Sequence, residues 1–365
     1  MKVLEINSKD LDYNVNQIKQ KAGESKVIAV LKGNGYGLGL EEFAMFLKDR
    51  GITDFAVSSV DEAVMLSKLK MEATILCMEA TAIKEDLEIL LENNVVITVG
   101  SSEAAKTLNE IAKNKNKKAH VHLKIDTGFS RYGILYNEKD KIINVIKGNT
   151  ALYFDGVFSH FSCAYFSDEK YTRLQFERFV KVKEFIEKND IKIPLYHIAN
   201  SSAFLQYPEM YLDAVRIGSA FLGRISVKNP SIELRRIGMI KSNIVEIKNI
   251  IKGTPIGYSN SDIAKKDMKL AIVPVGYSDG YNVEVGNDTF KMVDKIRILK
   301  NSFRAFFNKN RISLKINDKQ YCVVGRVGMN HVAVDVTNNL VKIGDEVKIE
   351  INPVLVSSGI RREYI

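Results

Sequence analysis

Short apolar runs alternate with stretches of helical period along the first two-thirds of the chain, and this alternation restricts the possible folds most. Strands that are buried on both faces and separated by helices pair in parallel. Eight such units over about 220 residues favour a closed (β/α)8 TIM-type barrel, although an open α/β sheet gives the same alternation. The eight candidate strands are residues 27–31, 55–58, 74–77, 95–99, 120–124, 154–159, 195–198 and 214–218.

The pattern changes after residues 223–230, where turn residues and segments of period two replace the alternation. These segments predict a smaller and mainly antiparallel β domain. A chain of 365 residues also suits two domains better than one. We therefore expect residues 8–228 to form the barrel and residues 229–365 to form the β domain, with residues 1–7 paired with the latter. The period-two segments are residues 242–247, 270–275, 321–325 and 332–336.

The composition excludes several classes of protein. With 45% hydrophobic and 27% charged residues, the chain has the balance of a soluble globular protein. No apolar stretch reaches the roughly 18–20 residues of a membrane span. The sequence turns polar at Lys2 and has no apolar signal-peptide core, so we expect a cytoplasmic protein that does not bind a membrane. The three cysteines are odd in number and widely spaced, which predicts neither a disulfide framework nor a zinc site.

The net charge of +9 raises the question of a nucleic-acid partner. The densest basic cluster, residues 113–118, lies where a helix is predicted to end, and cationic side chains there complement the helix dipole. No aromatic residues interleave with this cluster, as they do on surfaces that stack nucleic-acid bases. We therefore expect no nucleic-acid partner.

Lys32 is the first of several polar residues that follow predicted strands, and the carboxyl ends of barrel strands form one catalytic face. A partly desolvated lysine has a lowered pKa and can form a Schiff base. Glycines at positions 33, 35, 37 and 39 would let the backbone approach a bulky ligand closely. Taken alone, however, a lysine in this position is more often a surface residue beside a flexible turn.

Other predicted strand ends supply further polar groups for the same rim. His160 alone is more often a hydrogen-bonded core histidine, and Arg216 alone is more often a structural ion-pair partner. Gly218 and Ser219 could present backbone N–H groups to a phosphate, an arrangement that recurs near the last barrel strands. Their position on one rim favours a shared site. The polar residues at these strand ends are Arg131, His160, Asn200, Ser201 and Arg216.

Residues 29–39, Ala-Val-Leu-Lys-Gly-Asn-Gly-Tyr-Gly-Leu-Gly, resemble the pyridoxal-phosphate lysine motif of the alanine racemases. The resemblance continues along almost the whole chain. Each further block is weak alone, but their order across two domains is very specific. The blocks are residues 122–128 with Arg131, 159–161, 197–201, 215–218, 257–259, 275–281 and 325–329.

The resemblance implies a pyridoxal 5′-phosphate enzyme with two opposed acid/base groups. Lys32 would hold the cofactor and act on one face of the substrate α-carbon, while Tyr258 from the second domain would act on the other. A free tyrosine has a pKa near 10, so His160 and Arg216 would favour its phenolate. Arg216 would also face the pyridine nitrogen of the cofactor and leave it unprotonated, which disfavours side reactions such as transamination.

The resemblance also implies how the ligands are bound. Arg131 and the backbone at Met329 would bind the carboxylate of a small amino-acid substrate. Lys124 matches a position that is carbamylated in some relatives. The family arrangement is a head-to-tail homodimer in which one subunit contributes Tyr258 and Met329 to the site around Lys32 of the other. The remaining cofactor-binding residues, most of them for the phosphate, would be Tyr36, Ser201, Gly218 and Ser219, with Asn200 beside them.

This sequence departs from the family near the substrate. The usual Cys-Met-Asp reads Gly-Met-Asn at residues 328–330, and residues 281–283 lack the usual arginine. After residues 344–347 the usual helical insert and phosphate-contacting tyrosine are missing, and Asn352 stands near that position. These changes lead to the hypothesis that serine or a longer amino acid is processed alongside alanine, or instead of it.

Two other functions are compatible with parts of this pattern. A pyridoxal-phosphate-dependent decarboxylase of basic amino acids has the same architecture, but it would not keep a tyrosine opposite the lysine. A non-catalytic pyridoxal-phosphate-binding barrel would end before the β domain. Tyr258 and Arg131 therefore favour racemisation, although a catalytically inactive descendant of a racemase would have the same sequence features.

Overall fold

The computed structural model describes residues 2–166, 168–283, 292–307 and 312–365, and the chain divides into two compact units. The barrel unit is Ser8–Ile237, and the β unit combines Met1–Asn7 with Gly238–Ile365. The division falls after Ile237 and not after residue 228, because the segment that includes Arg235 and Ile237 is hydrogen-bonded to the barrel unit. Asn14 accepts from the N–H of Arg235 at 2.7 Å, and the N–H of Ile237 donates to the Leu222 carbonyl at 3.0 Å.

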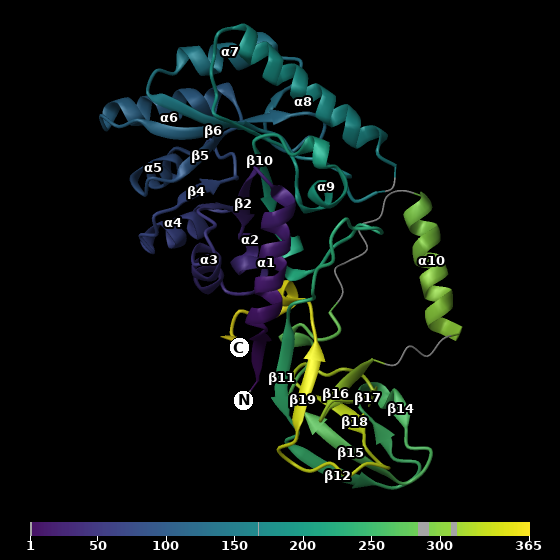
Figure 1. Cartoon of the computed structure of the whole chain (residues 1–365). Helices are drawn as coiled ribbons and strands as arrows, with labels where there is room; N and C mark the ends of the chain where they lie inside the picture. Colours follow the sequence, from purple (N-terminus) through teal and green to yellow (C-terminus); the bar gives the residue numbers. More distant parts are fainter. Residues whose placement is uncertain (1, 167, 284–291, 308–311) are drawn as a thin grey trace. The chain divides into compact units, whose positions relative to one another are not determined.

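Eight strands of the barrel unit form a closed parallel sheet, which confirms the predicted TIM-type barrel (Figure 1). The last strand pairs with the first, Arg216 opposite Ile28, and the remaining gap is closed by pairing of the fourth strand with the fifth. The strands are β2 (Lys26–Val30), β3 (Asp54–Val57), β4 (Thr74–Cys77), β5 (Val96–Val99), β6 (Ala119–Asp126), β8 (Leu152–Phe158), β9 (Leu195–His197) and β10 (Ala214–Ile217). A short strand, β7 (Ile134–Leu135), pairs with the end of β6.

Helices connect the barrel strands on the outside of the sheet (Figure 1). Two of them begin at serine caps. The Ser59 hydroxyl accepts from the N–H of Glu62 at 3.3 Å, and the Ser101 hydroxyl accepts from the N–H of Ala104 at 3.1 Å. The helices are α1 (Ser8–Ala22), α2 (Lys32–Tyr36), α3 (Leu40–Lys48), α4 (Val60–Lys68), α5 (Lys84–Glu92), α6 (Ser102–Asn114), α7 (Lys139–Gly148), α8 (Lys170–Lys188) and α9 (Ser201–Gln206), with 3-10 turns η1 (Pro208–Met210) and η2 (Ser219–Leu222).

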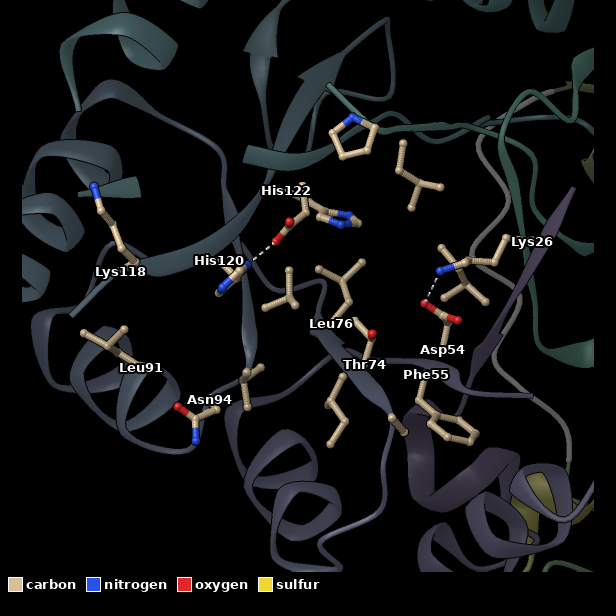
Figure 2. Close-up of a pocket in the computed structure, with 18 residues that line it drawn as sticks. Lys26, Asp54, Phe55, Thr74, Leu76, Leu91, Asn94, Lys118, His120 and His122 are labelled. Carbon is tan, nitrogen blue, oxygen red and sulfur yellow. Dashed lines mark hydrogen bonds and ion pairs between the residues drawn. The ribbon is translucent and has the colours of Figure 1, made fainter. Parts of the chain in front are cut away.

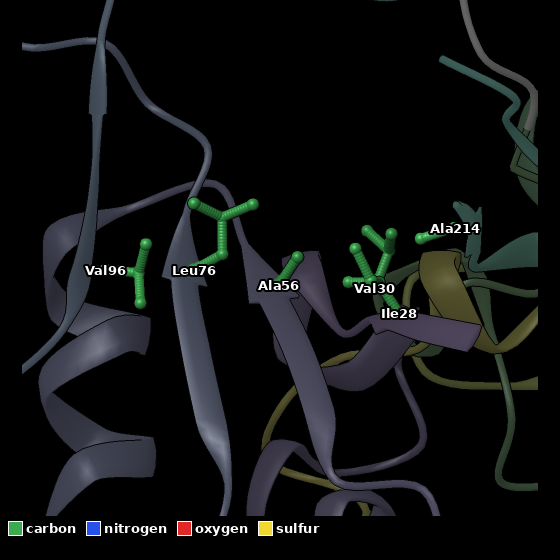
Figure 3. Packing of buried hydrophobic residues seen from close by; sticks show 6 residues of the cluster. All are labelled: Ile28, Val30, Ala56, Leu76, Val96 and Ala214. Atoms are coloured by element: carbon green, nitrogen blue, oxygen red, sulfur yellow. The ribbon is translucent and has the colours of Figure 1, made fainter. Parts of the chain in front are cut away.

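Apolar side chains from successive strands fill the inside of the barrel (Figure 3). Ile28 and Val30 alternate along β2 and therefore point to the same, inner face. Tyr36 and Met78 pack against this cluster from the carboxyl ends of the strands. The packed interior gives the strand ends a rigid base. The buried cluster consists of Ile28, Val30, Ala56, Leu76, Val96 and Ala214.

The β unit is a nine-stranded sheet in which the first strand of the chain lies between β11 and the last strand. Only the pairing of β1 with β20 is parallel among the strand pairs described for this sheet. The predicted strand at residues 242–247 is two strands. The nine are β1 (Val3–Ile6), β11 (Met239–Asn243), β12 (Glu246–Ile250), β15 (Met268–Val273), β16 (Ser313–Ile316), β17 (Lys319–Val324), β18 (Val332–Asp335), β19 (Glu346–Glu350) and β20 (Arg361–Tyr364).

Smaller elements complete the β unit. The strands β13 (Pro255–Ile256) and β14 (Asp262–Ile263) pair on either side of the turn η3 (Tyr258–Asn260). Further turns are η4 (Tyr277–Asp279) and η5 (Pro353–Leu355), and the helix α10 spans Met292–Phe307. Among the helices that the structure describes, none combines the length and apolar character needed to cross a membrane.

Candidate active site

A cavity of about 360 Å³ opens at the carboxyl ends of the barrel strands. All the site residues predicted within the barrel contribute to its wall. Met78, Glu79, Tyr132 and Phe158 line it as well. The alternating strands and helices therefore bring residues almost 190 positions apart, from Lys32 to Ser219, into one cavity. The predicted residues in the wall are Lys32, Tyr36, Lys124, Arg131, His160, Asn200, Ser201, Arg216, Gly218 and Ser219.

Lys32 stands at the start of a left-handed turn directly after β2. Gly33, Asn34 and Gly35 have φ angles of 66°, 56° and 64°, a region that glycine enters without steric cost. The turn is fixed at Asn34, whose N–H donates to Glu62 and whose side-chain oxygen accepts from the N–H of Leu40, both at 2.9 Å. The glycine-rich sequence thus sets the lysine in a defined position.

The amine of Lys32 is prepared for nucleophilic chemistry. Burial, followed by the positive charge of Arg131, lowers its pKa, while Glu62 opposes the shift. A lowered pKa increases the fraction of neutral amine, which is the form that attacks a carbonyl group. Burial and the charge of Arg131 therefore favour the form of Lys32 that can form a Schiff base.

Arg216 lies at the end of β10 and organises the floor of the cavity. Nη2 donates to the Ser159 carbonyl at 2.7 Å and contacts Nδ1 of His160 at 3.1 Å. Nη1 donates to Nδ1 of His197 at 2.7 Å. Burial, followed by the charge of Arg131, lowers the pKa of Arg216 to about 9, so it still carries its charge at neutral pH. The guanidinium is held by carbonyl oxygens and imidazole nitrogens.

His160 is a neutral imidazole in this environment. Burial, followed by the nearby charge of Arg216, holds its pKa well below the ordinary value, and Arg131 acts in the same direction. Its ring also meets the edge of Phe129, with 5.4 Å between ring centres. Because an arginine N–H can only donate, Nδ1 of His160 must accept, and the proton of the neutral ring lies on Nε2.

Polar groups at the ends of β9 and β10 form a cradle suited to a phosphate. The N–H of Gly218 donates to the Ser201 hydroxyl at 3.0 Å. A Cβ atom on Gly218 would lie 2.6 Å from the Tyr36 ring, so only glycine lets this ring approach the backbone. Burial raises the pKa of Tyr36 to about 12, which keeps its hydroxyl a neutral donor. Asn200 caps α9 by accepting from the N–H of Ala203 at 3.1 Å.

Lys124 and Arg131 belong to β6 and the loop after it. Lys124 is buried with its amine 4.2 Å from the centre of the Phe158 ring, and burial with the charges of Arg216 and Arg131 holds its pKa well below the ordinary value. The loop turns around Asp126, whose carboxylate accepts from the N–H groups of Gly128 and Phe129 at 2.8 and 2.9 Å. Arg131 is exposed at the mouth of the cavity, over the Phe129 ring.

The two remaining predicted site residues, Tyr258 and Met329, lie in the β unit. Their side chains are 71% and 52% exposed. The positions are near each other, because a Cβ atom on Gly328 would lie 3.7 Å from the Tyr258 ring. Ser278 holds the Met329 carbonyl through both its N–H and its hydroxyl, at 3.0 and 2.7 Å. The β unit therefore presents Tyr258 and Met329 on one exposed area.

Two buried histidines near Arg216 were not identified as site residues from the sequence. His197 contacts Arg216 directly. His122 contacts His197, with 3.0 Å between Nδ1 of His122 and Nε2 of His197. Both stand within strands, where the sequence predicts their burial but not which strand residues face each other. Glu62 was not predicted from the sequence either, since its contact with Asn34 joins the first turn of α4 to α2.

A second and larger cavity, of about 560 Å³, opens at the amino ends of the barrel strands (Figure 2). Four of its side chains form two ion pairs. Lys26 pairs with Asp54 at 3.1 Å, and His120 pairs with Asp155 at 2.7 Å. None of the predicted site residues lines this cavity. The smaller cavity around Lys32 is therefore the candidate active site.

Comparison with known proteins identifies the family. The model of the alanine racemase N-terminal domain matches residues 6–225, and that of the alanine racemase C-terminal domain matches residues 237–353. The chain belongs to the alanine racemase family. This confirms the resemblance seen in the sequence and makes the chain an enzyme of the amino-acid racemase class. Members of the alanine racemase family are generally dependent on pyridoxal phosphate.

Individual relatives in the alanine racemase family match over nearly the whole chain. The alanine racemase of Clostridium tetani is 34% identical over 350 residues, which cover 94% of this chain and 84% of that protein. Alanine racemase 2 of Caldanaerobacter subterraneus is 33% identical, with 95% and 84% covered. The solved structure of alanine racemase from Clostridium difficile 630 superposes with a TM-score of 0.87 at 28% identity, covering 100% of this chain and 95% of that one.

Proposed function

We propose that the chain interconverts L- and D-alanine with pyridoxal 5′-phosphate as its cofactor, and that Lys32 and Tyr258 are its two acid/base groups. The observation that carries this proposal is the cavity that joins a lysine of lowered pKa, a buried arginine and a phosphate cradle. Family membership favours neither a decarboxylase nor a non-catalytic binding protein. We place the enzyme in the cytoplasm, as expected from its sequence.

The residues of the cavity fit this cofactor. Lys32 offers an amine of lowered pKa for the aldehyde group. The hydroxyl groups of Tyr36 and Ser201 and the backbone N–H of Ser219 offer donors for the phosphate, and Gly218 supports them through its N–H bond to the Ser201 hydroxyl. Arg216 offers a donor that does not give up its proton, which suits an unprotonated ring nitrogen. When bound, the cofactor supplies an electron-withdrawing ring that stabilises negative charge at the substrate α-carbon.

Racemisation needs proton transfer on both faces of the α-carbon, because one base returns the proton mainly to the face it came from. Lys32 moves the proton on one face, and we assign the other face to Tyr258. In the proposed arrangement, Nε2–H of His160 would donate a hydrogen bond to the Tyr258 oxygen and stabilise negative charge on it. Arg131 and the Met329 backbone bind the substrate carboxylate.

We further propose a head-to-tail homodimer. Tyr258 and Met329 are exposed near each other in the β unit, as expected for residues that meet a ligand. In the proposed dimer they complete the cavity around Lys32 of the partner subunit. A monomer would then bind the cofactor but would lack the second acid/base group.

We propose that serine is a substrate alongside alanine. Asn330 replaces the aspartate that the family usually has, and its side-chain oxygen accepts from the Ser278 hydroxyl at 2.8 Å. The Ser278 hydroxyl also contacts the Met329 carbonyl, so the neutral amide of Asn330 lies close to that carbonyl. A neutral amide tolerates a substrate hydroxyl as donor or acceptor.

Replacement of Lys32 tests cofactor attachment. We expect Lys32→Ala, mixed with pyridoxal phosphate, to lack the visible absorbance of the bound cofactor and to lose racemisation. Lys26→Ala is the matched control, because Lys26 begins β2, the strand that precedes Lys32, and is paired with Asp54. The control should keep both the absorbance and the activity. An unchanged absorbance band in Lys32→Ala would overturn the assignment.

Replacement of Tyr258 tests the second acid/base group. Tyr258→Phe should keep the cofactor absorbance and slow exchange of the α-proton with deuterated solvent much more for one alanine enantiomer than for the other. Tyr153→Phe, at an exposed tyrosine of the barrel unit, serves as control and should exchange both enantiomers at the normal rate. Equal slowing of both enantiomers would contradict the two-base assignment.

A further inference from the structure

The hydrogen bonds of Arg216 continue into the barrel core through two buried histidines. Nη1 of Arg216 lies 2.7 Å from Nδ1 of His197, and Nε2 of His197 lies 3.0 Å from Nδ1 of His122. The three side chains come from three strands, β10, β9 and β6. His122 also reaches the wall of the cavity at the amino ends of the strands (Figure 2). A single chain of hydrogen bonds therefore runs inward from the candidate active site.

The chemistry of the donors fixes where each proton lies. An arginine N–H can only donate, so Nδ1 of His197 must accept. The proton of a neutral His197 then lies on Nε2 and points to Nδ1 of His122, which must accept in turn. The proton of a neutral His122 lies on its own Nε2. Each contact thus determines the tautomer of the next ring.

Charge and burial keep both rings neutral. Burial lowers the pKa of His122 to about 3, and the charges of Arg216 and Lys26 act in the same direction. Burial holds the pKa of His197 well below its ordinary value, and the charge of Arg216 lowers it further. Arg216 and Lys26 are cations, so each of them disfavours an imidazolium. The chain of hydrogen bonds has one protonation state at neutral pH.

Packing holds both rings in one orientation. The His197 ring stacks on Phe158, with 5.0 Å between the ring centres and 3° between the planes. The His122 ring lies against Gly156, where a Cβ atom would come within 2.7 Å of it. Neither ring has room to turn over without displacing its neighbour. The hydrogen-bond direction is therefore built into the fold.

We propose that His122 is a positioning residue for Arg216. By accepting the His197 proton it keeps Nδ1 of His197 an acceptor, and this acceptor aims the guanidinium. The inference rests on the proposed function to the extent that Arg216 faces the cofactor ring. The hydrogen-bond chain itself is a property of the protein alone.

Two substitutions separate the hydrogen bond from the space that the ring fills. His122→Leu removes the acceptor, so His197 either buries an unpaired N–H or moves its proton to Nδ1, where it would face the N–H of Arg216. The first outcome leaves the His197 ring without the contact that fixes its orientation, and the second removes the acceptor that aims Arg216. His122→Asn puts an amide oxygen near the former position of Nδ1 and restores an acceptor. His120→Asn changes the exposed histidine of the same strand and serves as control.

The first experiment reads the tautomers in the full chain without cofactor. In protein labelled with 15N-histidine, we expect His122 and His197 to be neutral with the proton on Nε2 from about pH 5 to about pH 8. His122→Leu should change the His197 signals, whereas His122→Asn and His120→Asn should preserve them. A His197 proton on Nδ1, or protonation of either ring near neutral pH, would overturn the proposal.

The second experiment uses the protein with pyridoxal phosphate. We expect His122→Leu to lower kcat for alanine at least tenfold with little change in KM, and to change the pH dependence of the cofactor absorbance. His122→Asn should recover most of both at a similar melting temperature. Normal kcat and absorbance in His122→Leu would refute the role. If the wild-type protein binds no cofactor, the proposed function fails, whereas the tautomer measurement still decides the hydrogen-bond chain.

Discussion

Nη2 of Arg216 lies 3.1 Å from Nδ1 of His160, and burial together with the Arg216 charge keeps the pKa of that imidazole well below its ordinary value. His160 is therefore a neutral ring whose Nε2–H remains to donate. In the proposed two-base mechanism, Arg216 would supply positive charge near the Tyr258 oxygen, and His160 would supply a hydrogen bond. This division of roles gives each of the two residues a distinct expected phenotype.

We predict that His160→Leu moves the pH profile of racemisation to higher pH. Without the Nε2–H donor, the negative charge that the proposed proton transfer places on the Tyr258 oxygen would be less well stabilised. A hydrogen bond to a charged group contributes about 1.5–3 kcal/mol, so kcat/KM at neutral pH should fall on the order of 10- to 100-fold. The measurement is kcat/KM across pH. His160→Gln, which can place an amide N–H near Nε2, should recover part of the activity, and an unshifted profile in His160→Leu would exclude this role.

We predict that the cofactor-free protein loses stability in mild acid. His122, His160 and His197 all have folded pKa values below that of the unfolded chain, about 6.5. The unfolded state therefore binds more protons below about pH 6.5, and the free energy of unfolding falls as the pH drops through that value. For His122 the fall continues toward its folded pKa of about 3. Each histidine contributes up to about 1.4 kcal/mol per pH unit.

Urea unfolding at about pH 7.5 and about pH 5.5 measures this dependence. His122→Asn should weaken the pH dependence, because one of the three depressed groups is gone. A free energy of unfolding that stays constant over this range in the wild-type protein would show that the buried histidines are not held neutral.

We predict that Gly218→Ala weakens cofactor binding at least tenfold. The added Cβ would meet the Tyr36 ring at 2.6 Å, so the ring must leave the phosphate cradle. Gly148→Ala is the matched control, since nothing lies within 4 Å of the Cβ it adds. Titration with pyridoxal phosphate, followed by visible absorbance, compares the two dissociation constants. Equal affinities would place the phosphate elsewhere.

We predict that Lys124 takes up carbon dioxide. A buried lysine of strongly lowered pKa carries a neutral amine, whose nitrogen can bond to the carbon of carbon dioxide while a proton leaves to solvent. The resulting negative charge would be stabilised by Arg131 and Arg216, the two cations that now lower the pKa of Lys124. With 13C-bicarbonate, the wild-type protein should give a carbamate resonance that Lys124→Ala lacks. No such resonance in the wild-type protein would mean that Lys124 stays an amine.

The barrel and most of its site were predictable because they depend on local patterns. Each barrel strand is an apolar run, and the polar residue after it falls at the carboxyl end whichever strand is its neighbour. Lys32, Arg131 and Arg216 were placed in this way. The contact of His122 with His197 was not, because it joins residues 75 positions apart and depends on which side chains point inward.

Two errors in the β unit and at its boundary have the same cause. Residues 242–247 read as one strand, but Ile244 bonds to Asp345 and Val245 bonds to Ile272, so the chain changes its strand partner between them. Residues 229–237 read as the start of the β domain, but the buried side chain of Asn14 holds Arg235 against the barrel unit. The hydrophobic pattern of the sequence does not show which strand residues 242–247 pair with, or that Arg235 is bonded to Asn14.

The optical rotation of L-alanine, incubated with the purified protein and pyridoxal phosphate, tests the proposed reaction most directly. We predict that the rotation falls to zero as both enantiomers reach equal amounts, that L-serine follows more slowly, and that no carbon dioxide is released. Constant rotation of every amino acid tested in a protein with bound cofactor, or release of carbon dioxide from a basic amino acid, would contradict the proposed racemisation.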